Sequence, residues 1–367
     1  MRVVQVSDVF LPRVGGIEMQ VHDLAREQIR AGDRVRVLTL TPGEHGDGLD
    51  IRHPERPWWR RRPAGEHLAG ADVVHCHSSI VSPLSWAAAR QATRQGLPVV
   101  VTVHSMITPT ATVGRGFAGV VRALGPAVVW TAVSRAAAAI LQPFVRTPVT
   151  VLPNGIEPGV WRRPTAGSPQ GPGRTIVTVM RLAPRKRPLP TVDILADIRA
   201  RMDPTVPLRA VIIGDGPQRS AVAAQLRARR MTDWVQLTGR LSRDAIAEQL
   251  AVSDLYLAPA HHESFGIAAL EARCAGVPVA AMAGGGVTDF IHDGVEGLIT
   301  PSDADMGRRS AELLQNAVVL ERMRRHNLTV PTGLDWAGSL ARTTAVYQDA
   351  AQRCNQIHSD ELVRIDS

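Results

Sequence analysis

A single lysine lies in a short cationic loop of this chain. Of the 42 basic residues, Lys186 is the only one that is not arginine. Lysine carries a compact point charge, whereas arginine carries a planar, forked one. The one position that has lysine is therefore a candidate for chemistry. Arg181 precedes it in the segment MRLAPRKRP, directly after an expected strand. Two cations in one such loop could neutralise a diphosphate without a metal.

Two glutamates, Glu263 and Glu271, are separated by seven residues in the segment HHESFGIAALEA. We expect Ser264 to cap a helix whose first turn contains Gly266. Eight residues of helix rise about 12 Å, roughly the reach of a nucleotide sugar from its ribose to its hexose. Glu271 could then bind a ribose diol and Glu263 the sugar hydroxyls, with helix N–H groups facing the anionic middle. Spacing alone favours two unrelated surface glutamates.

A pair of glycines, Gly15 and Gly16, follows the first expected strand and opens an expected helix in the segment VGGIE. Because glycine has no side chain, backbone N–H groups can there approach a phosphate at the helix N-terminus. A simple tight turn explains these residues equally well. This loop is a third candidate for contact with a diphosphate.

Strand and helix patterns alternate along the chain, and the candidate loops follow strands. The expected strands are short apolar runs at Arg2–Val6, Arg34–Leu40, Asp72–His77, Pro98–His104, Val128–Ser134, Pro148–Pro153, Thr175–Met180, Leu208–Gly214, Trp234–Gly239, Leu255–Pro259 and Val277–Met282. The helical patterns lie at Glu18–Arg30, in an Ala-rich stretch ending at Arg94, and at Leu189–Arg201, Pro217–Arg230, Asp244–Ala251, Phe265–Ala275 and Trp336–Ala351. This alternation is typical of parallel sheets, whose ligands bind beyond the carboxyl ends of the strands.

The alternation occurs twice, on either side of a segment rich in Pro, Gly and Ser. At roughly 150 residues per domain, 367 residues are enough for two domains. We therefore expect a first domain over residues 1–157, a linker over 158–173, a second domain over 174–335 and a C-terminal segment over 336–367.

The composition excludes several classes of protein. A hydrophobic content of 44% argues against a disordered chain, and no apolar run reaches the roughly 18 residues of a membrane span. Three scattered cysteines form no C-x-x-C pair, which excludes a disulfide framework and argues against structural zinc. Met1 leads straight into an expected strand without a cleavage-site pattern, so we expect a cytoplasmic protein.

The charge balance favours anionic partners. The 42 basic and 34 acidic residues give a net charge of +8, which suits nucleotides, phosphates, an anionic membrane face or nucleic acid, although a bias toward arginine explains it too. The dinucleotide fingerprint G-x-G-x-x-G is present only as its first half, at Gly214 and Gly216, and no Walker A motif precedes Lys186. These absences argue against a nicotinamide oxidoreductase and a P-loop NTPase.

Taken in order, the motifs resemble the retaining glycosyltransferases of family 4. They are GGIE from Gly15, DVVHCH ending at His77, TVH ending at His104, AVS ending at Ser134, LPNGI ending at Ile156, RLAPRK ending at Lys186, IIGDGP from Ile212, TGR ending at Arg240 and E-x7-E ending at Glu271. The resemblance covers about residues 1–350. It implies an α/β fold of two Rossmann-like, doubly wound parallel-sheet domains facing a cleft, known as GT-B, with a C-terminal helix that crosses back to the first domain.

The resemblance also implies roles for individual residues and a metal-independent reaction without a cofactor. A hexose of glucose, mannose or N-acetylglucosamine type would move from a UDP- or GDP-sugar to an acceptor hydroxyl, with the donor phosphate assisting deprotonation of the acceptor. The implied catalytic residues are His104, Arg181, Lys186 and Glu263, and those that bind the donor are Gly15, Gly16, Gly214, Arg240, Phe265, Gly266, Ile267 and Glu271.

Two positions depart from the family pattern. The family often has glycine after the lysine of the phosphate loop, whereas Arg187 and Pro188 follow here and make the loop stiffer and more cationic. The glycine-rich loop of the second domain usually ends in glutamate, whereas Asp289 stands here. We therefore assign Asp289 no role.

Two further pairs of polar residues have the spacing of metal ligands, but we do not interpret them as metal sites. Asp303 and Asp305 mimic a metal-binding D-x-D, but they lie in a polar segment that we interpret as a solvated loop. His75 and His77 have no nearby carboxylate in the sequence and make a poor metal site. We expect His77 to face the acceptor and His75 to be a packed neighbour, and we predict no metal site.

The segment PERPWWRRRPAG stands apart from the family motifs. Trp58, Trp59 and Arg60 could anchor at an anionic membrane interface, which would make the protein peripheral at the inner membrane face. They could also cover an acceptor sugar or stack on single-stranded nucleic acid. A variable surface loop is the plainest interpretation, and we expect no nucleic-acid partner.

Two alternatives to sugar transfer remain open. A nucleotide-sugar 2-epimerase would use acid and base residues in the cleft without an acceptor site. An inactive sugar-nucleotide binding module would serve a partner enzyme, although the presence of Arg181, Lys186 and Glu263 argues against a decayed site. The acceptor could be a small molecule, a glycan or a lipid, and its identity is not readable from these residues.

Overall fold

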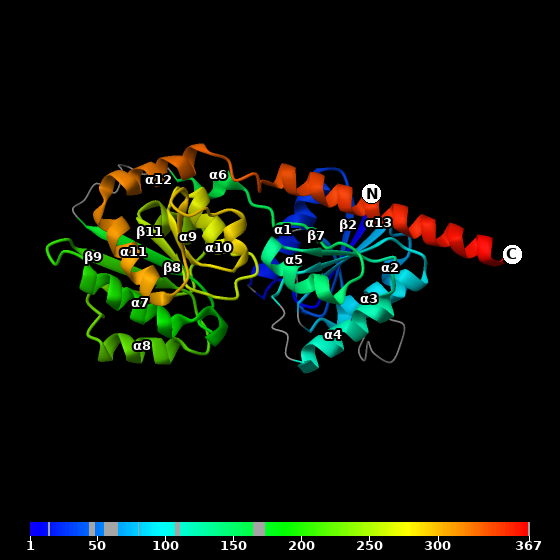
Figure 1. Ribbon diagram of the computed structural model, residues 1–367. Coiled ribbons are helices and arrows are strands. Elements are labelled where there is room, and N and C mark those ends of the chain that lie inside the picture. The colour runs from blue at the N-terminus through cyan, green and yellow to red at the C-terminus, as the bar shows by residue number, and fades with distance from the viewer. Residues whose placement is uncertain are drawn as a thin grey trace. The chain divides into compact units, whose positions relative to one another are not determined.

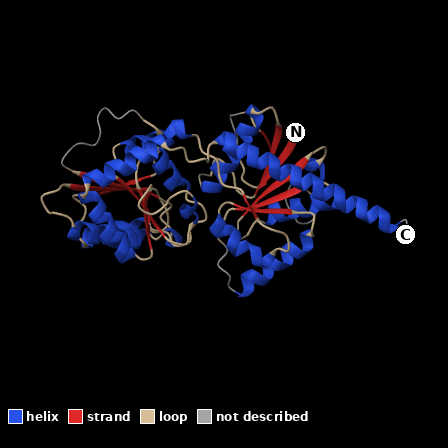
Figure 2. Cartoon of the chain, turned by 45° about the horizontal axis from the view of Figure 1, so that its top comes forward, coloured by secondary structure: helices blue, strands red, loops and turns tan. Residues whose placement is uncertain are grey.

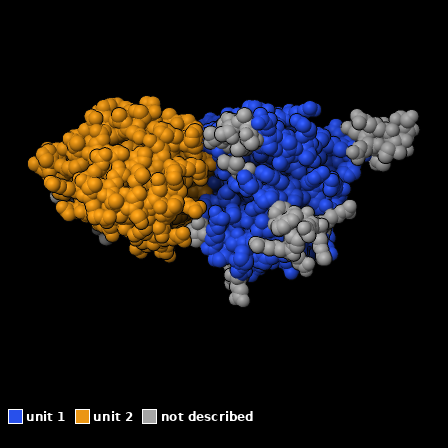
Figure 3. Space-filling model, turned by 90° about the horizontal axis from the view of Figure 1, so that it is seen from below, with its two compact units in different colours: residues 1–155, 334–367 blue, residues 156–333 orange. Residues whose placement is uncertain are grey.

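A computed structural model describes residues 1–13, 15–43, 48–54, 65–79, 81–106, 111–163 and 173–365. The chain divides into two compact units (Figure 3). Unit 1 comprises Met1–Gly155 and Leu334–Ser367, and unit 2 comprises Ile156–Gly333. In Figure 2, the strands of each unit run between helices on both faces of a sheet.

Unit 1 contains a parallel sheet of seven strands. In chain order these are β1 (Arg2–Ser7), β2 (Arg34–Thr39), β3 (Asp50–Arg52), β4 (Val73–Ser78), β5 (Val99–Val103), β6 (Val129–Ala132) and β7 (Thr150–Val151). They are arranged β3-β2-β1-β4-β5-β6-β7, and every pairing between them is parallel. The strands β4 and β5 are buried along their whole length, which explains their nearly unbroken apolar sequence.

The helices of unit 1 come from both ends of the chain. They are α1 (Gly16–Arg30), α2 (Gly65–Leu68), α3 (Pro83–Arg94), α4 (Ala111–Leu124), α5 (Arg135–Leu141), the 3-10 turn η1 (Gln142–Phe144) and α13 (Trp336–Ile365). Helix α13, red in Figure 1, contacts α1 and β5 and adds Val346, Tyr347 and Ala350 to the core of unit 1. The expected return of the C-terminal helix to the first domain is thereby confirmed.

Unit 2 contains a parallel sheet of six strands. They are β8 (Arg174–Val179), β9 (Leu208–Ile213), β10 (Val235–Gly239), β11 (Leu255–Ala258), β12 (Val279–Met282) and β13 (Gly297–Thr300). The order is β10-β9-β8-β11-β12-β13, the doubly wound order of a Rossmann domain. Its helices and 3-10 turns are α6 (Pro158–Trp161), η2 (Pro184–Lys186), α7 (Pro188–Arg201), α8 (Arg219–Ala228), α9 (Arg243–Ala251), α10 (Ile267–Cys274), η3 (Gly286–Asp289), α11 (Asp303–Gln315) and α12 (Ala317–Thr329).

The structure corrects several expected elements. The strand series does not end at Met282, because a further strand, β13, pairs with β12. The sequence did not indicate β13, which is too short to show a period. Helix α4 was not expected, since Gly114, Gly116 and Gly119 weaken its helical pattern. Helix α13 continues past Ala351 to Ile365. The segment Pro158–Gly173 begins with helix α6, and its residues 164–172 lie outside the described part of the chain.

Candidate active site

The candidate residues of unit 2 follow the two strands at which the sheet changes direction. The strand order proceeds outward from β8 in one direction and from β11 in the other, and these two strands are neighbours. Loops that leave the carboxyl ends of such a pair form the usual binding crevice of an open α/β sheet. Lys186 lies in the loop after β8, and Glu263 lies in the loop after β11.

Lys186 and Glu263 form an ion pair between these two loops. The side chains are 24% and 19% exposed, so the pair is screened from water but still open to a ligand. Lys186 ends η2, where its N–H donates to the carbonyl of Ala183 over 2.9 Å. The chain's one lysine ammonium is thus held beside a carboxylate that could instead bind sugar hydroxyls. An anionic donor entering this crevice would compete with Glu263 for Lys186.

The helix near Glu263 starts later than expected. Gly266, in the left-handed region at φ 92°, is the N-cap of α10, so Ser264 is not the N-cap residue. Glu263 therefore lies outside the helix, and the interpretation that one helix spans Glu263 to Glu271 is wrong. A Cβ on Gly266 would lie 2.5 Å from Cγ2 of Val287, so both conformation and space require glycine there.

The other predicted donor-binding residues of this segment lie in α10 or directly before it. Ile267 is the first residue of α10, and Phe265 is buried with its ring 5.4 Å from that of Phe290. Glu271 lies one turn further along α10 and is partly buried. The carbonyl of Glu263 accepts a 2.7 Å hydrogen bond from the N–H of Gly286, so the glycine-rich loop after β12 supports the Glu263 loop.

Gly214, Arg181 and Arg240 lie at the same carboxyl edge of the unit 2 sheet. A Cβ on Gly214 would lie 1.9 Å from the carbonyl oxygen of Met180, because the loops after β8 and β9 cross closely there. Gly214 also donates to the carbonyl of Gly239 over 2.8 Å, which ties in the loop after β10. Arg181 and Arg240 follow β8 and β10 and are exposed. The structure thus places all three at the edge where the sequence predicts the donor.

Asp303 and Arg187 form a contact that the sequence did not indicate. Asp303 is the first residue of α11 and not part of a loop, so the expectation of a solvated polar loop is wrong. Its two carboxylate oxygens accept hydrogen bonds from the two terminal nitrogens of Arg187, each over 2.7 Å. The Arg187 guanidinium lowers the pKa of Asp303 through these bonds. Asp305, by contrast, pairs with Arg308 of its own helix.

In unit 1, Gly15 and Gly16 begin α1 immediately after the loop that follows β1. Gly15 is the N-cap and has no side chain to satisfy the first N–H groups of the helix, and Gly16 is the first helical residue. The carboxylate of Glu18, in the same turn, lies beside Gly15 and pairs with Arg13 over 3.0 Å. The backbone donors of this turn are therefore close to one carboxylate already.

His77 and His104 belong to a buried polar network in unit 1. His77, at the end of β4, is 3% exposed, and His104, just after β5, is 8% exposed. Nδ1 of His77 lies 2.9 Å from Nε2 of His104, and Nε2 of His77 lies 2.6 Å from Oε1 of Gln5. Both ring nitrogens of His77 are thus hydrogen-bonded within the protein. The expected direct contact of His77 with the acceptor substrate would require one of these bonds to be broken.

Tyr347 of α13 anchors the other end of this network. Its hydroxyl oxygen accepts from Nε2 of Gln5 at 3.1 Å and from Nε2 of Gln28 at 3.0 Å. The hydroxyl proton is therefore directed to Nδ1 of His75, 2.9 Å away. Nε2 of His75 then donates to Oγ1 of Thr102 over 2.6 Å. His75 is a packed neighbour, as expected, but it also links the C-terminal helix to the sheet.

The same bonds define which nitrogen of each histidine carries a proton. Oε1 of Gln5 can only accept, so Nε2 of His77 is the protonated nitrogen and its Nδ1 accepts from Nε2–H of His104. This leaves the lone pair of His104 on Nδ1. Burial lowers the pKa of His104 to about 4 and of His75 to about 3, and burial also lowers the pKa of His77. All three rings are neutral at pH 7.

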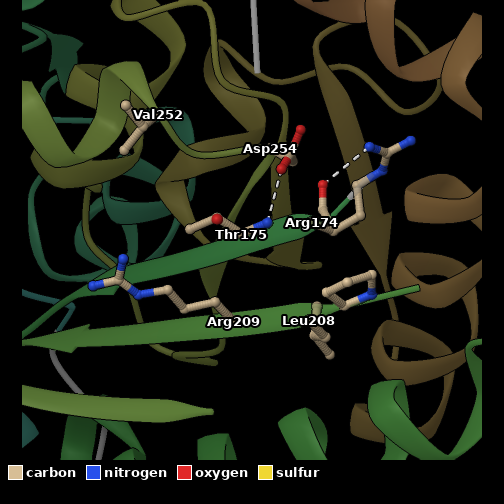
Figure 4. Close-up of a pocket in the computed structure, with 8 residues that line it drawn as sticks. Arg174, Thr175, Leu208, Arg209, Val252 and Asp254 are labelled. Carbon is tan, nitrogen blue, oxygen red and sulfur yellow. Dashed lines mark hydrogen bonds between the residues drawn. The ribbon is translucent and has the colours of Figure 1, made fainter. Parts of the chain in front are cut away.

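Each unit contains a cavity, and only that of unit 1 borders the groups described above. One of about 20 Å³, large enough for a single water molecule, is bordered by His77, His104 and the C-terminal helix residues Ser339 and Thr343. The other, of about 290 Å³, lies in unit 2 at the amino ends of β8 and β9, opposite the Lys186 edge. In Figure 4, Asp254 in this second cavity accepts a 2.7 Å hydrogen bond from the N–H of Thr175.

Trp58, Trp59 and Arg60 lie outside the described residues, so the membrane-contact and stacking interpretations stay predictions. Within the described ranges, no helix has both the length and the apolar character needed to cross a bilayer. The same ranges contain no group of three His, Cys, Asp or Glu side chains arranged to hold a metal ion. Gln5, Gln28 and Tyr347 carry no motif, and only their burial as polar residues could have pointed to them.

Comparison with known proteins gives the family. The family model "Glycosyltransferase Family 4" matches residues 14–160, and "Glycosyl transferases group 1" matches residues 165–328. The chain is 25% identical over 395 residues to a phosphatidylinositol N-acetylglucosaminyltransferase subunit of Arabidopsis thaliana, covering 99% of this chain and 85% of that one. It is 28% identical over 362 residues to D-inositol 3-phosphate glycosyltransferase of Thermobispora bispora, covering 90% and 83%.

A shorter match and the solved structures agree with this. The 2-deoxystreptamine N-acetyl-D-glucosaminyltransferase of Niallia circulans is 34% identical over 122 residues, 33% of this chain and 31% of that protein. Anabaena HepE, solved with UDP and glucose, has a TM-score of 0.74 at 16% identity and covers 98% of this chain and 100% of its own. Fold and motifs thus define a glycosyltransferase with two Rossmann-like domains. The chain belongs to glycosyltransferase family 4, with the GT-B architecture.

Proposed function

We propose that this glycosyltransferase moves a hexose from a UDP-sugar to an acceptor hydroxyl, with retention of anomeric configuration and without a metal. The observation that supports the proposal most is the Lys186–Glu263 ion pair at the β8/β11 crevice. An ammonium and a carboxylate there match the two halves of a sugar diphosphate. Its phosphates need a cation, and its sugar hydroxyls need a hydrogen-bond acceptor.

The reaction would proceed by departure of the nucleoside diphosphate. As the bond between the anomeric carbon and the β-phosphate oxygen breaks, negative charge grows on that phosphate, and Lys186 and Arg181 stabilise it. The acceptor hydroxyl forms the new glycosidic bond on the same face of the sugar and passes its proton to a donor phosphate oxygen. No protein side chain then has to act as the nucleophile. Glu263 and the backbone of residues 265–267 bind the hexose, and Glu271 binds the ribose.

We further propose that His104 contacts the donor sugar or the acceptor through Nδ1. The network through His77 and Gln5 leaves the lone pair on that atom, so His104 would accept a hydrogen bond from a hydroxyl. Its lowered pKa keeps it neutral, which suits an acceptor of hydrogen bonds better than a proton donor. His77 in this proposal holds His104 and does not touch the substrate.

The names of the relatives suggest substrates to test first. HepE has been solved with UDP and UDP-glucose, and two relatives are named as N-acetylglucosaminyltransferases. The relatives' names also contain inositol or 2-deoxystreptamine, both of which are six-membered carbocycles bearing hydroxyls. We therefore propose a UDP-hexose as donor and a cyclitol hydroxyl, on a free cyclitol or a lipid, as acceptor.

The test combines UDP-N-acetylglucosamine, UDP-glucose and GDP-mannose with inositol, inositol phosphates and 2-deoxystreptamine. We expect a glycoside with the donor's anomeric configuration by NMR, formed equally well in a chelator. Free N-acetylmannosamine without an acceptor would instead indicate a 2-epimerase, and tight binding of UDP without turnover a binding module. A product of inverted configuration would contradict the proposed course of the reaction.

A further inference from the structure

Arg187, the residue directly after Lys186, has a backbone conformation that arginine seldom adopts. Its φ of 59° and ψ of 46° lie in the left-handed region, where a Cβ crowds the following carbonyl group. Among the described residues, only Arg187 and Arg230 combine a side chain with positive φ. Glycine adopts this conformation without cost, whereas a residue that carries a Cβ is strained in it. Something in this chain must therefore hold Arg187 in place.

The side chain of Arg187 provides that restraint. Its two terminal nitrogens donate to the two oxygens of Asp303 over 2.7 Å each, a bidentate pairing that fixes both position and orientation. One of these nitrogens also donates to the carbonyl of Pro259 over 3.0 Å. The side chains of Arg187 and Asp303 are 19% and 39% exposed, so the contact is partly protected from water.

This contact connects the segments that carry both members of the ion pair. The backbone of Arg187 joins η2, which ends at Lys186, to α7, where Thr191 donates to the carbonyl of Arg187 over 3.0 Å. Pro259 directly follows β11 and leads, four residues later, to Glu263. Asp303 begins α11. A single guanidinium thus links the end of the Lys186 turn, the start of the Glu263 loop and a helix of the core.

We propose that Arg187, held by Asp303, is a positioning residue that sets the ammonium of Lys186 opposite Glu263. The side-chain contact does by restraint what a glycine does by conformational freedom. The contact with the transferred sugar or its phosphates belongs to Lys186, and Arg187 acts through it. The catalytic part of this inference rests on the proposed function, whereas the geometric part does not.

The single lysine allows a direct measurement of its own placement. An amine-specific acetylating reagent can modify only Lys186 and the N-terminus, and peptide mass spectrometry separates the two. We would compare the parent enzyme with Asp303→Ala, Arg187→Gly and the double variant. Asp305→Ala is the matched control, because Asp305 is also in the first turn of α11 but pairs with Arg308. Asp303→Asn serves if Asp303→Ala folds poorly.

Asp303→Ala should raise the acetylation rate of Lys186 about fivefold or more, since the turn loses its restraint. Arg187→Gly should change it less than about twofold, and in that background Asp303→Ala should have no further effect. Asp305→Ala should resemble the parent. An unchanged rate in Asp303→Ala and Asp303→Asn, or an equal increase with and without Arg187, would overturn the proposal, because Asp303 would then act only through α11.

Kinetics complete the test. In Asp303→Ala we expect kcat to fall about tenfold or more with donor KM within about threefold, and Arg187→Gly in the same chain to restore most of it. A general loss of stability would not be restored by removing a second side chain. If the acetylation pattern appears as expected but no sugar is transferred by the parent, the proposed function fails and the positioning by Arg187 stands. If transfer occurs and the kcat of Asp303→Ala equals that of the parent, the catalytic part fails alone.

Discussion

Lys186 and Glu263 are 77 residues apart in the chain and form an ion pair across the β8/β11 crevice of unit 2. Each comes from the loop that follows one of two adjacent parallel strands whose connections run in opposite directions. The pair therefore occupies the place where this fold binds ligands, and it presents one charge of each sign.

Lys186→Arg is expected to reduce turnover far more than binding. Arginine keeps the charge, so UDP should bind within about tenfold of the parent value. The broader guanidinium cannot occupy the ammonium's position beside Glu263. Losing a positioned hydrogen-bond donor at the leaving phosphate costs roughly 100- to 1000-fold in kcat. The measurement is kcat for sugar transfer beside the Kd for UDP. Turnover within about threefold of the parent would mean that the lone lysine is an accident of composition.

Glu271→Ala should weaken the binding of the donor with little effect on chemistry. In the proposed site, Glu271 binds the ribose, away from the bond that breaks. The loss of charged hydrogen bonds costs about 1.5–3 kcal/mol, seen mainly in donor KM. Steady-state kinetics at saturating acceptor measure both constants. A lower kcat at unchanged donor KM would contradict the ribose assignment.

Tyr347→Phe should destabilise the protein although it removes only one oxygen. The two amide donors of Gln5 and Gln28 and the acceptor nitrogen of His75 would all lose a buried partner. Leaving such groups unsatisfied costs about 1–3 kcal/mol in the free energy of unfolding. Urea denaturation measures it, with Tyr256→Phe as control, because that hydroxyl bonds a single carbonyl. An equal or smaller loss for Tyr347→Phe would mean that the network contributes little.

Stability should fall as the pH drops below about 6.5 and approaches 4. The pKa of His75 and His104 is lowered from the ordinary 6.5 to about 3 and about 4, so protons bind the unfolded chain first. The contribution is fully present above the unfolded pKa and decreases by up to about 1.4 kcal/mol per pH unit for each histidine as pH falls through this window. Urea midpoints from about pH 7.5 to 4.5 would measure this, and His104→Asn should flatten the curve. An equally steep curve in that variant would assign the effect to other groups.

Glu296→Ala should be strongly destabilising because it leaves a buried arginine unpaired. Arg273, two residues after Glu271 in α10, and Glu296 are each 5% exposed in their side chains. Removing one partner of such a pair costs about 3–5 kcal/mol. Glu312→Ala, which breaks an exposed pair with Arg308, should cost less than about 1 kcal/mol. Thermal unfolding compares the two variants, and similar losses would contradict this prediction.

Much of the architecture follows from local pattern. Alternating apolar runs and helical periods define two parallel-sheet domains, because each strand buried on both faces needs a continuous apolar sequence. The rule that ligands bind beyond strand ends then directs attention to the loops containing Lys186 and Glu263. The family motifs in those loops add roles that spacing alone leaves open.

Details that depend on backbone geometry were harder to predict. The start of α10 follows from the left-handed conformation of Gly266 and the side chain of Val287 beside it, neither of which has a signature in the segment itself. The four-residue strand β13 is defined by its pairing with β12 and is too short to show a period.

The sequence by itself determined the two α/β domains, the family and the loops of the candidate site. Only the tertiary structure decided the partners of the side chains in those loops. Arg187 meets Asp303 across 116 residues, and Tyr347 meets His75 across 272. The physical reason is that strand order in a parallel sheet is set by long-range packing, so loops and helices distant in the chain come together only when the sheet is complete.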